Sequence, residues 1–282
     1  MGANIKAVRA RMKSVDSTRH ITKAMELVAS SKIRRASERM ESSLFYRGIM
    51  LDAFAALSAE KSRYSSPRDR SLPALYIVIA GDRGLAGGYN NNIFRSATAV
   101  VGKNDLVLPI GKRAVEHFGK SGEIVTDKFT SAENFSSSDS AEAARIVRDL
   151  YDDGRVSSVT LIFTRYISML SQEPDVEYLL PLGRKMNPTK EETGISGQKA
   201  LVEYEPDAET LLAALISEYI SGVLYSCVAE SFASELAARR SAMDTATKNA
   251  DAMLEELSLK YNRARQGEIT QEITEIIAGA NA

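Results

Sequence analysis

The chain has 282 residues, of which 44% are hydrophobic and 26% charged, and its formal net charge is −1. This composition is typical of a globular protein with one or two domains, and a net charge near zero gives no general reason to expect a nucleic-acid binder. The single cysteine, Cys227, excludes an intramolecular disulfide bond. No run approaches the ~18 apolar residues of a membrane span, so we expect no direct membrane insertion, and any link to a membrane must pass through partners.

Residues 1–60 predict one long helix. There is no glycine between Gly2 and Gly48, and the first proline is Pro67. Apolar residues recur every three or four positions, which is typical of a helix that packs along one side. This stripe consists of Ile5, Val8, Met12, Val15, Ile21, Met25 and Val28, and its last members, Lys32 and Arg35, are basic. The start is basic and poor in acids, as a transit peptide is, but the periodicity continues past Met40, so we interpret it as a structural helix.

Residues 74–204 predict an α/β domain, because strand and helix patterns alternate there and all seven prolines lie between residues 67 and 206. Expected strands are Leu75–Ala80, Leu106–Ile110, Glu123–Thr126 and Val156–Phe163, and expected helices are Asn90–Val101, Lys112–Gly119 and Ser140–Tyr151. The first and last strands are nearly continuous apolar runs, which favours buried parallel strands. Residues 160–182 predict two strands around a Gln-Glu-Pro-Asp turn at residues 172–175, as at an antiparallel edge.

A glycine-rich loop, GDRGLAGG at residues 81–88, joins the first strand to a helix, as a phosphate-binding loop does. A dinucleotide-binding loop has the spacing G-x-G-x-x-G and a P-loop ends in G-K-[ST]; this loop has neither. Asp82 would also place a negative charge beside a phosphate. We therefore favour a tight turn in which glycines permit close packing, and nucleotide binding remains the alternative.

Catalytic patterns are equally weak. The two histidines, His20 and His117, lie on different elements and match no metal-ligand spacing. Cys227 lies among Val223, Leu224 and Val228, which favours a small core residue over a nucleophile. We predict no catalytic residue, no bound cofactor and no metal.

Residues 207–282 predict a second long helix, since they contain no proline. A narrow seam steps by three and four residues through Met243, Ala246, Ala250, Met253 and Leu257, with Leu236 one heptad earlier. Such a seam is typical of a coiled coil, and the helix would be roughly 100 Å long, against about 80 Å for residues 1–60. Residues 1–40 hold ten Lys or Arg and three acids, whereas residues 207–282 hold twelve acids and six bases. Opposite charges favour pairing of the two arms; two solvated faces without mutual preference are the alternative.

Three motifs resemble those of the gamma subunit of F-type ATP synthases, the central rotor shaft. GDRGLAGGYN is similar to that family's D-R-G-L-C-G-G-x-N, with Ala86 in place of the usual cysteine. The N-terminal IKAVRARMKSVDSTRHITKAMELVASSKIRRA and the C-terminal ITQEITEIIAGA resemble its two terminal signatures. The resemblance covers essentially the whole chain. It implies a long antiparallel coiled coil of helices 1–60 and 207–282 with a Rossmann-like α/β domain, 74–204, at its foot, and a glycine loop without nucleotide.

The resemblance also implies a mechanical role without catalysis. The coiled coil would turn inside a hexamer of three alpha and three beta subunits, which carry the ATP sites. The foot would bind the epsilon subunit and the membrane-embedded c-ring, in a complex that also contains the delta subunit. Proton flow would drive rotation, or ATP hydrolysis the reverse. The chain would then be peripheral, at the cytoplasmic face of a bacterial cell membrane.

Partner-contact residues follow from the same resemblance. Arg265 and Gln266 would contact a loop of a beta subunit, with Thr270 and Glu272 nearby and Arg239 in the same polar network. Met25 would lie near the acidic lever of a beta subunit, with Lys23 and the basic residues Lys32, Arg34 and Arg35 as looser neighbours. Ile273, Ile276 and Ile277 would lie in an apolar bearing. The alternative for each charged residue is a solvated helix face, which we would prefer without the resemblance for all except Arg265 and Gln266. Gly267 lowers helix propensity by about 1 kcal/mol, so we expect local softness there.

Two other classes of protein remain open. A Rossmann-type enzyme with helical extensions would bind a nucleotide saturably. A coiled-coil scaffold or chaperone would bind unfolded clients and would not copurify with a hexamer of fixed stoichiometry.

Overall fold

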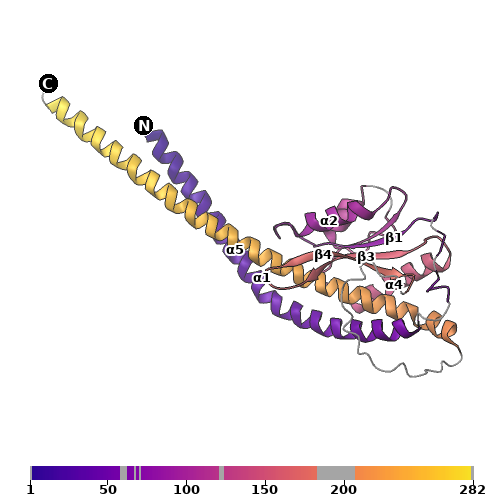
Figure 1. Ribbon diagram of the computed structural model, residues 1–282. Helices are drawn as coiled ribbons and strands as arrows, with labels where there is room; N and C mark the ends of the chain where they lie inside the picture. The colour runs from indigo at the N-terminus through magenta and orange to yellow at the C-terminus, as the bar shows by residue number, and fades with distance from the viewer. Residues whose placement is uncertain are drawn as a thin grey trace. The chain divides into compact units, whose positions relative to one another are not determined.

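The computed structural model of the chain describes residues 2–57, 62–66, 68–69, 71–120, 124–182 and 207–280. Its helices are α1 (Gly2–Leu57), α2 (Tyr89–Val100), α3 (Lys112–Phe118), α4 (Ser137–Asp152) and α5 (Ala208–Ala280). Its strands are β1 (Leu75–Ile79), β2 (Leu106–Ile110), β3 (Val159–Tyr166) and β4 (Gln172–Leu180). The chain divides into two compact units, a helical unit of residues 1–31 and 239–282 and a sheet unit of residues 32–238. Both long helices contribute to both units (Figure 1).

The sheet unit contains a four-stranded sheet in the order β2-β1-β3-β4. β1 pairs in parallel with β2 and β3, and β4 pairs antiparallel with β3 at the edge. The expected alternation of strand and helix, the parallel pairing and the antiparallel edge are therefore confirmed. Parallel strands need a crossover connection, usually a helix. Here α2 lies in the connection between β1 and β2, and α4 in the connection between β2 and β3.

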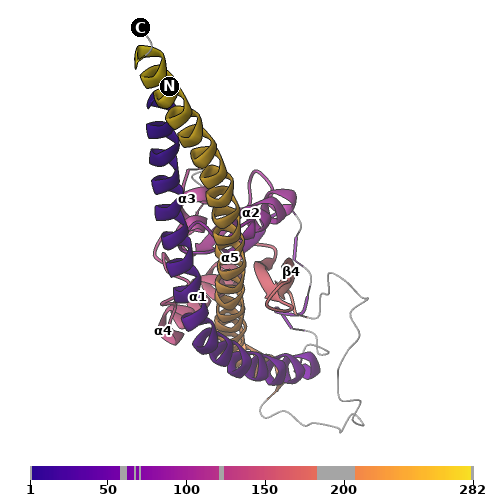
Figure 2. The same cartoon turned by 90° about the vertical axis from the view of Figure 1, so that its left-hand side faces the viewer.

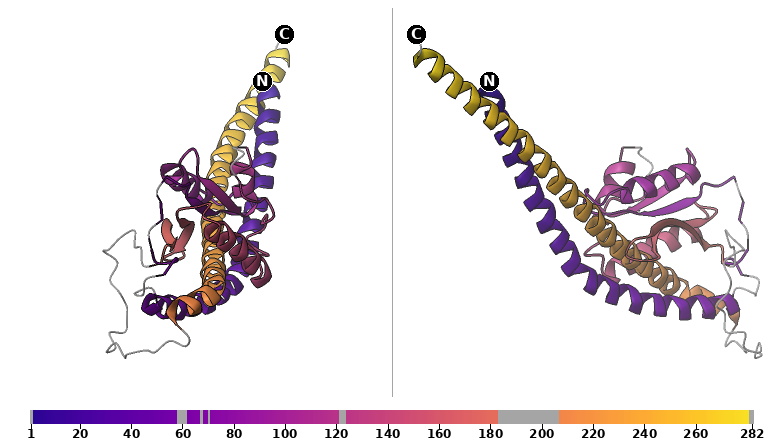
Figure 3. Two further views of the ribbon diagram at one scale, coloured as in Figure 1. Left: turned by 90° about the vertical axis from the view of Figure 1, so that its right-hand side faces the viewer. Right: turned by 60° about the vertical axis from the view of Figure 1, so that its left-hand side comes forward.

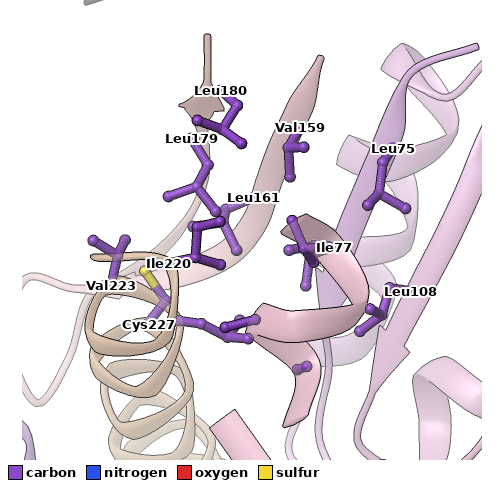
Figure 4. Packing of buried hydrophobic residues seen from close by; sticks show 14 of the residues in the cluster. Leu75, Ile77, Leu108, Val159, Leu161, Leu179, Leu180, Ile220, Val223 and Cys227 are labelled. Atoms are coloured by element: carbon purple, nitrogen blue, oxygen red, sulfur yellow. The ribbon is translucent and has the colours of Figure 1, made fainter. Parts of the chain in front are cut away.

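Helices cover both faces of this sheet (Figures 1 and 3). α2 and α3 pack on Val78 of β1 and on Ala80, which directly follows that strand, whereas α4 and part of α5 pack on the alternate residues Leu75, Ile77 and Ile79 of β1. The larger hydrophobic core lies on the face covered by α4 and α5. Figure 4 shows side chains of α5 directed at the sheet. Each fully buried Leu, Ile or Val contributes about 1.5–3 kcal/mol, so the sheet holds this part of α5 firmly.

Two details of the α/β prediction were wrong. Residues 172–175 lie inside β4, and the chain reverses at residues 167–171, between the ends of β3 and β4. Pro174 is tolerated because β4 is an edge strand and needs no donor on its outer side. The expected strand Glu123–Thr126 is reduced to one bridge between Ile124 and Val107, and Glu123 lies outside the described residues. Residues 183–204 of the predicted domain also lie outside them.

The predicted helices agree closely with the structure, apart from the start of α4. This helix begins at Ser137, three residues before the expectation, because Ser136 and Asp139 form a capping box. The Ser136 side chain accepts from the Asp139 backbone and the Asp139 side chain accepts from the Ser136 backbone, which satisfies two amide groups at the helix start.

α1 and α5 run antiparallel within the sheet unit. Ile33 and Met40 of α1 share an apolar cluster with Leu236 of α5, whereas Phe54, farther along α1, stacks on Tyr219 with ring centroids 4.4 Å apart. As the residue number rises along α1, the residue number of its contact on α5 falls, so the two helices are antiparallel. Pairing of the two long helices, the central prediction, is confirmed.

The predicted stripe of α1 is confirmed at Val15, which is buried, but the packed face departs from it from Ile21 onward. Ile21 and Val28 are 58% and 55% exposed, and Arg35 is exposed as well. The buried residues of α1 are Val15, Thr22, Ala29, Ile33, Ala36, Met40, Ser43, Arg47 and Phe54. Small and hydroxyl side chains let two helices approach closely, so from Ile21 onward a face chosen by hydrophobicity alone was misassigned by one position. Of the α5 seam, Leu236, Met243 and Ala250 are buried.

α5 is long and apolar enough to cross a membrane by length and composition, with a window of mean hydropathy 1.7. The statement that no segment approaches a span was therefore too strong. The finding is weak evidence for a span, because half of that window is buried inside the fold, and a core helix has the same composition.

Candidate functional site

All ten predicted contact residues belong to the helical unit, where the first part of α1 lies beside the last part of α5 (Figures 2 and 3). Thr22 Oγ1 lies 2.8 Å from Thr247 Oγ1, and Arg19 Nη1 lies 3.4 Å from the Asp251 carboxylate. These pairs again run antiparallel. The ion pair is exposed and contributes at most about 1 kcal/mol, so opposite charge favours this pairing but stabilises it little.

Met25 and Lys23 lie on α1 in this unit. Met25 is partly buried, whereas Lys23 is exposed and bonds Glu26 at 2.9 Å. Ile21, Met25 and Val28 are spaced by four and three residues, so they share one face of the helix. Since Ile21 and Val28 are more than half exposed, this face presents an apolar stripe to the surroundings of the unit. Contiguous exposed apolar side chains indicate a contact surface.

Arg239 differs from the other predicted contacts. Its side chain is buried, with 9% of the residue exposed, whereas Arg265, Gln266, Thr270 and Glu272 are all exposed on α5. Arg239 can therefore position the helix more readily than it can reach another protein. The assignment of these five residues to partner contact stays a prediction.

The last turns of α5 carry a second exposed apolar stripe. Ile269, Ile273, Ile276 and Ile277 are 42%, 52%, 71% and 56% exposed. Their spacing places them along one side of the helix. Every residue from 271 to 279 is exposed, so the described chain provides no cover for this stripe. Gly267 does not interrupt α5, and the expected softness there stays a prediction.

The glycine-rich loop of the sheet unit is filled by contacts from the protein itself. The Asp82 carboxylate accepts hydrogen bonds from the Ala132 and Glu133 amides at 2.8 and 3.1 Å and from Ser131 Oγ at 3.0 Å. Gly81 packs so closely on α5 that a Cβ there would lie 2.7 Å from Cδ of Glu235. The geometry supports a packing turn and gives no support to a phosphate site.

Reactive groups are not gathered anywhere in the described residues. Burial raises the pKa of the Cys227 thiol to about 12, so Cys227 is a neutral core residue, as its sequence neighbours indicated. No cluster of three His, Cys, Asp or Glu side chains within the described ranges could hold a metal ion. Within the ranges that the structure describes, the arrangement offers exposed surfaces for binding other proteins and does not assemble a catalytic group.

Sequence reasoning missed a buried ionic network in the sheet unit. Arg47 of α1 pairs with Glu177 of β4 and, at 3.4 Å, with Glu230 of α5. The Glu230 carboxylate also accepts from the Tyr166 amide at 3.0 Å. Only 6% of the Arg47 side chain and 3% of the Glu230 side chain are exposed. The sequence signal that could have revealed this network is the position of Arg47, which lies one heptad after Met40 and therefore on the packed face of α1.

Comparisons with known proteins agree with this arrangement. A family model described as ATP synthase matches residues 4–282. The ATP synthase gamma chain of Ruminococcus albus is 43% identical over 285 residues, which cover 97% of this chain and 96% of that protein. The ATP synthase gamma chain of Ruminiclostridium cellulolyticum is 39% identical over 294 residues, covering 100% of this chain and 99% of that protein.

Solved structures share the fold. A chain of the rotor of the Euglena gracilis mitochondrial ATP synthase matches with a TM-score of 0.68 at 19% identity, covering 95% of this chain and all of that one. A chain of the central stalk and c-ring structure of the Tetrahymena thermophila enzyme matches with a TM-score of 0.57 at 23% identity, covering 80% and 99%. The family model and the two gamma chains span almost the entire sequence, and the chain therefore belongs to the family of ATP synthase gamma chains, the non-catalytic rotor subunits of the central stalk.

Proposed function

We propose that this rotor subunit couples proton-driven rotation of a membrane c-ring to ATP synthesis, or hydrolysis to the reverse rotation, inside a hexamer of three alpha and three beta subunits. The observation that carries the proposal is the exposed isoleucine stripe at the end of α5. A helix end that is apolar on one side and uncovered by its own described chain is suited to turn within a sleeve supplied by other subunits.

The coupling would come from contacts that differ around the shaft. Each rotor angle presents different side chains to each beta subunit, and a partner changes state only through such a difference in interaction free energy. Moving a two-state site from mostly open to mostly closed needs roughly 5.5 kcal/mol. Ile21 and Val28 are 58% and 55% exposed and Met25 is partly buried, so covering these three side chains would supply part of that amount, roughly 2–4 kcal/mol.

The proposal assigns roles to individual residues. Met25 and Lys23 would contact the acidic lever of a beta subunit, and Arg265, Gln266, Thr270 and Glu272 a beta-subunit loop. Ile273, Ile276 and Ile277 would form the bearing, and Arg239 would support the polar contacts from its buried position. All of these residues except Arg239 are partly or fully exposed, which supports the proposed contacts.

The proposed assembly extends to the remaining subunits. The sheet unit would bind the epsilon subunit and the c-ring, in a complex that also contains the delta subunit. The chain would be peripheral, without direct insertion, on the cytoplasmic face of a bacterial inner membrane. The Euglena structure is named as a rotor and the Tetrahymena structure as a central stalk with c-ring, which supports the proposed contact with a c-ring. The corresponding division of the chain is 1–60 and 207–282 for the shaft and 74–204 for the foot.

Copurification tests the proposal directly. Coexpressed with alpha and beta subunits, the chain is expected to elute with them in a 3:3:1 ratio and, when immobilised complexes hydrolyse ATP, to rotate a bead fixed to the sheet unit. Saturable ATP binding by the isolated chain in calorimetry would instead favour the Rossmann-type enzyme. Copurification with unfolded clients and without the hexamer would favour a scaffold.

A further inference from the structure

We propose that the glycine-rich loop, residues 81–88, is a mechanical joint in which Asp82 is a positioning residue that makes the sheet and the two long helices of the sheet unit turn as one body. The proposal rests on the rotary function proposed above. It gives a role to a loop whose geometry does not support a phosphate site, and each contact that supports the proposal lies within residues 32–238.

The loop is held in one conformation by its own residues. Asn90 at the start of α2 accepts from the Gly81 amide at 2.9 Å and donates to the Arg83 carbonyl at 3.2 Å. Leu85 and Gly87 adopt positive φ values of 63° and 58°, which reverses the chain between β1 and α2. The backbone around Asp82 is thereby fixed, and its carboxylate is directed away from the loop toward residues 131–133.

Asp82 binds these residues, part of the segment 131–135 that we name the latch loop. One carboxylate oxygen accepts from the Ala132 amide, and the other accepts from the Glu133 amide and from Ser131 Oγ. All three distances lie between 2.8 and 3.1 Å. Bonds from amides to an ionised carboxylate are short and strong, so Asp82 and the latch loop form one rigid element.

The latch loop in turn is tied to both long helices. Lys32 of α1 pairs with the Glu133 carboxylate. Arg39 of α1 donates to the Glu133 carbonyl at 3.2 Å and to the Phe135 carbonyl. The Nε of Arg39 also donates to Tyr225 Oη of α5 at 3.0 Å. A single arginine therefore joins the latch loop, α1 and α5.

The glycine-rich loop also touches α5 directly. Gly81 faces the buried Glu235 carboxylate of α5, with no room for a Cβ, and Tyr89, the first residue of α2 after the loop, donates from Oη to the Ser231 carbonyl of α5 at 2.9 Å. These contacts explain why a glycine occupies position 81: any side chain there would push the sheet away from the helix.

Directional bonds add to apolar packing in this role. The apolar core holds the sheet on α5 because its buried side chains interdigitate, but the hydrophobic effect itself has no preferred direction. Hydrogen bonds weaken steeply as their angle changes, so the bonds of Asp82 and Arg39 resist rotation of the sheet relative to the helices. Torque applied to the sheet would thus reach α1 and α5 without slip.

The test uses the complete ATP synthase reconstituted in vesicles, with ATP hydrolysis and proton pumping measured on the same sample. Asp82→Ala is expected to leave the hydrolysis rate at the wild-type level and to lower the protons pumped per ATP several-fold. Arg39→Met is expected to do the same. Because both residues act in one chain of contacts, the double variant is expected to be no worse than either single variant.

Asp105→Ala is the matched control. Asp105 also accepts two backbone amide bonds, from Ala74 at 2.8 Å and Gly102 at 2.7 Å, but these partners lie beside the sheet and outside both long helices. Asp105→Ala is expected to remove two amide bonds to a carboxylate, as Asp82→Ala does, and to leave pumping per ATP unchanged.

Three results would each contradict the proposed joint. The first is a wild-type number of protons pumped per ATP by Asp82→Ala, and the second is an equal loss of pumping in Asp82→Ala and Asp105→Ala. The third is a loss in the double variant that equals the sum of the two single losses. If Asp82→Ala does not assemble, Arg39→Met carries the same test with the loop intact. Failure of the wild-type chain itself to support pumping would instead contradict the proposed function.

Discussion

Replacing Arg47 by methionine is expected to destabilise the sheet unit strongly while leaving its shape almost unchanged. Methionine retains much of the length of the arginine stem but removes the charge that lies between Glu177 and Glu230. The Glu230 side chain is 3% exposed, so water cannot replace the lost partner. At 3.4 Å and an effective dielectric constant of about 20, one ion pair corresponds to roughly 5 kcal/mol of Coulomb energy.

Part of that energy offsets the desolvation of the charges, so the expected loss is about 3–5 kcal/mol, as for other buried pairs from which one partner is removed. In a unit of this size each kcal/mol lowers the melting temperature by about 2–4 °C. The measurement is thermal and urea unfolding of the full chain, followed by near-ultraviolet circular dichroism of its tyrosines, most of which lie in the sheet unit.

Protonation gives an independent check. Burial raises the pKa of Glu230, so its charged form is less stable in the folded than in the unfolded chain. This penalty is present above the folded pKa and disappears as the pH falls through it. Without Arg47 the penalty is larger, and the deficit of Arg47→Met relative to wild type is expected to shrink between neutral pH and the ordinary carboxyl range.

The double variant Arg47→Met, Glu230→Gln is the control, because it removes the unpaired charge that the single variant leaves behind. It is expected to recover part of the stability. A loss below about 1 kcal/mol for Arg47→Met, or a deficit that grows as the pH falls, would refute the assignment of a buried, charged Glu230.

Three further expectations concern other parts of the chain. Gly111→Ala should cost at least about 2 kcal/mol in urea unfolding, because Gly111 has φ of 92° and a Cβ there would overlap the Ala80 carbonyl; a neutral result would contradict the backbone geometry. Joint replacement of Ile273, Ile276 and Ile277 by serine should leave the stability of the isolated chain unchanged, since all three are exposed. The same variant should assemble less well with alpha and beta subunits, and unchanged assembly would contradict their role in an apolar bearing. Amides around Gly267 should exchange hydrogen faster than those around Ala250, and equal protection would end the proposal of local softness.

The candidate site was predicted only through resemblance. Composition and periodicity indicated that residues 207–282 form one helix, and without the resemblance a solvated helix face was preferred for every charged contact residue except Arg265 and Gln266. The structure adds exposure: it shows Ile273, Ile276 and Ile277 uncovered, and it buries Arg239. Which partner covers the exposed residues depends on other chains, so neither the sequence pattern nor a single folded chain decides it.

The sequence by itself determined the long helices, the alternating strands and the pairing of the arms, because proline placement, apolar spacing and opposite charge act locally or over whole segments. Only the tertiary structure decided which face of α1 packs. Thr22 and Ala29 are buried and Ile21 and Val28 are exposed, because the smaller side chains let the two helices approach more closely. It also decided that Asp82 binds the latch loop. Those amides lie about fifty positions away along the chain, and a local pattern carries no information on partners that only folding brings together.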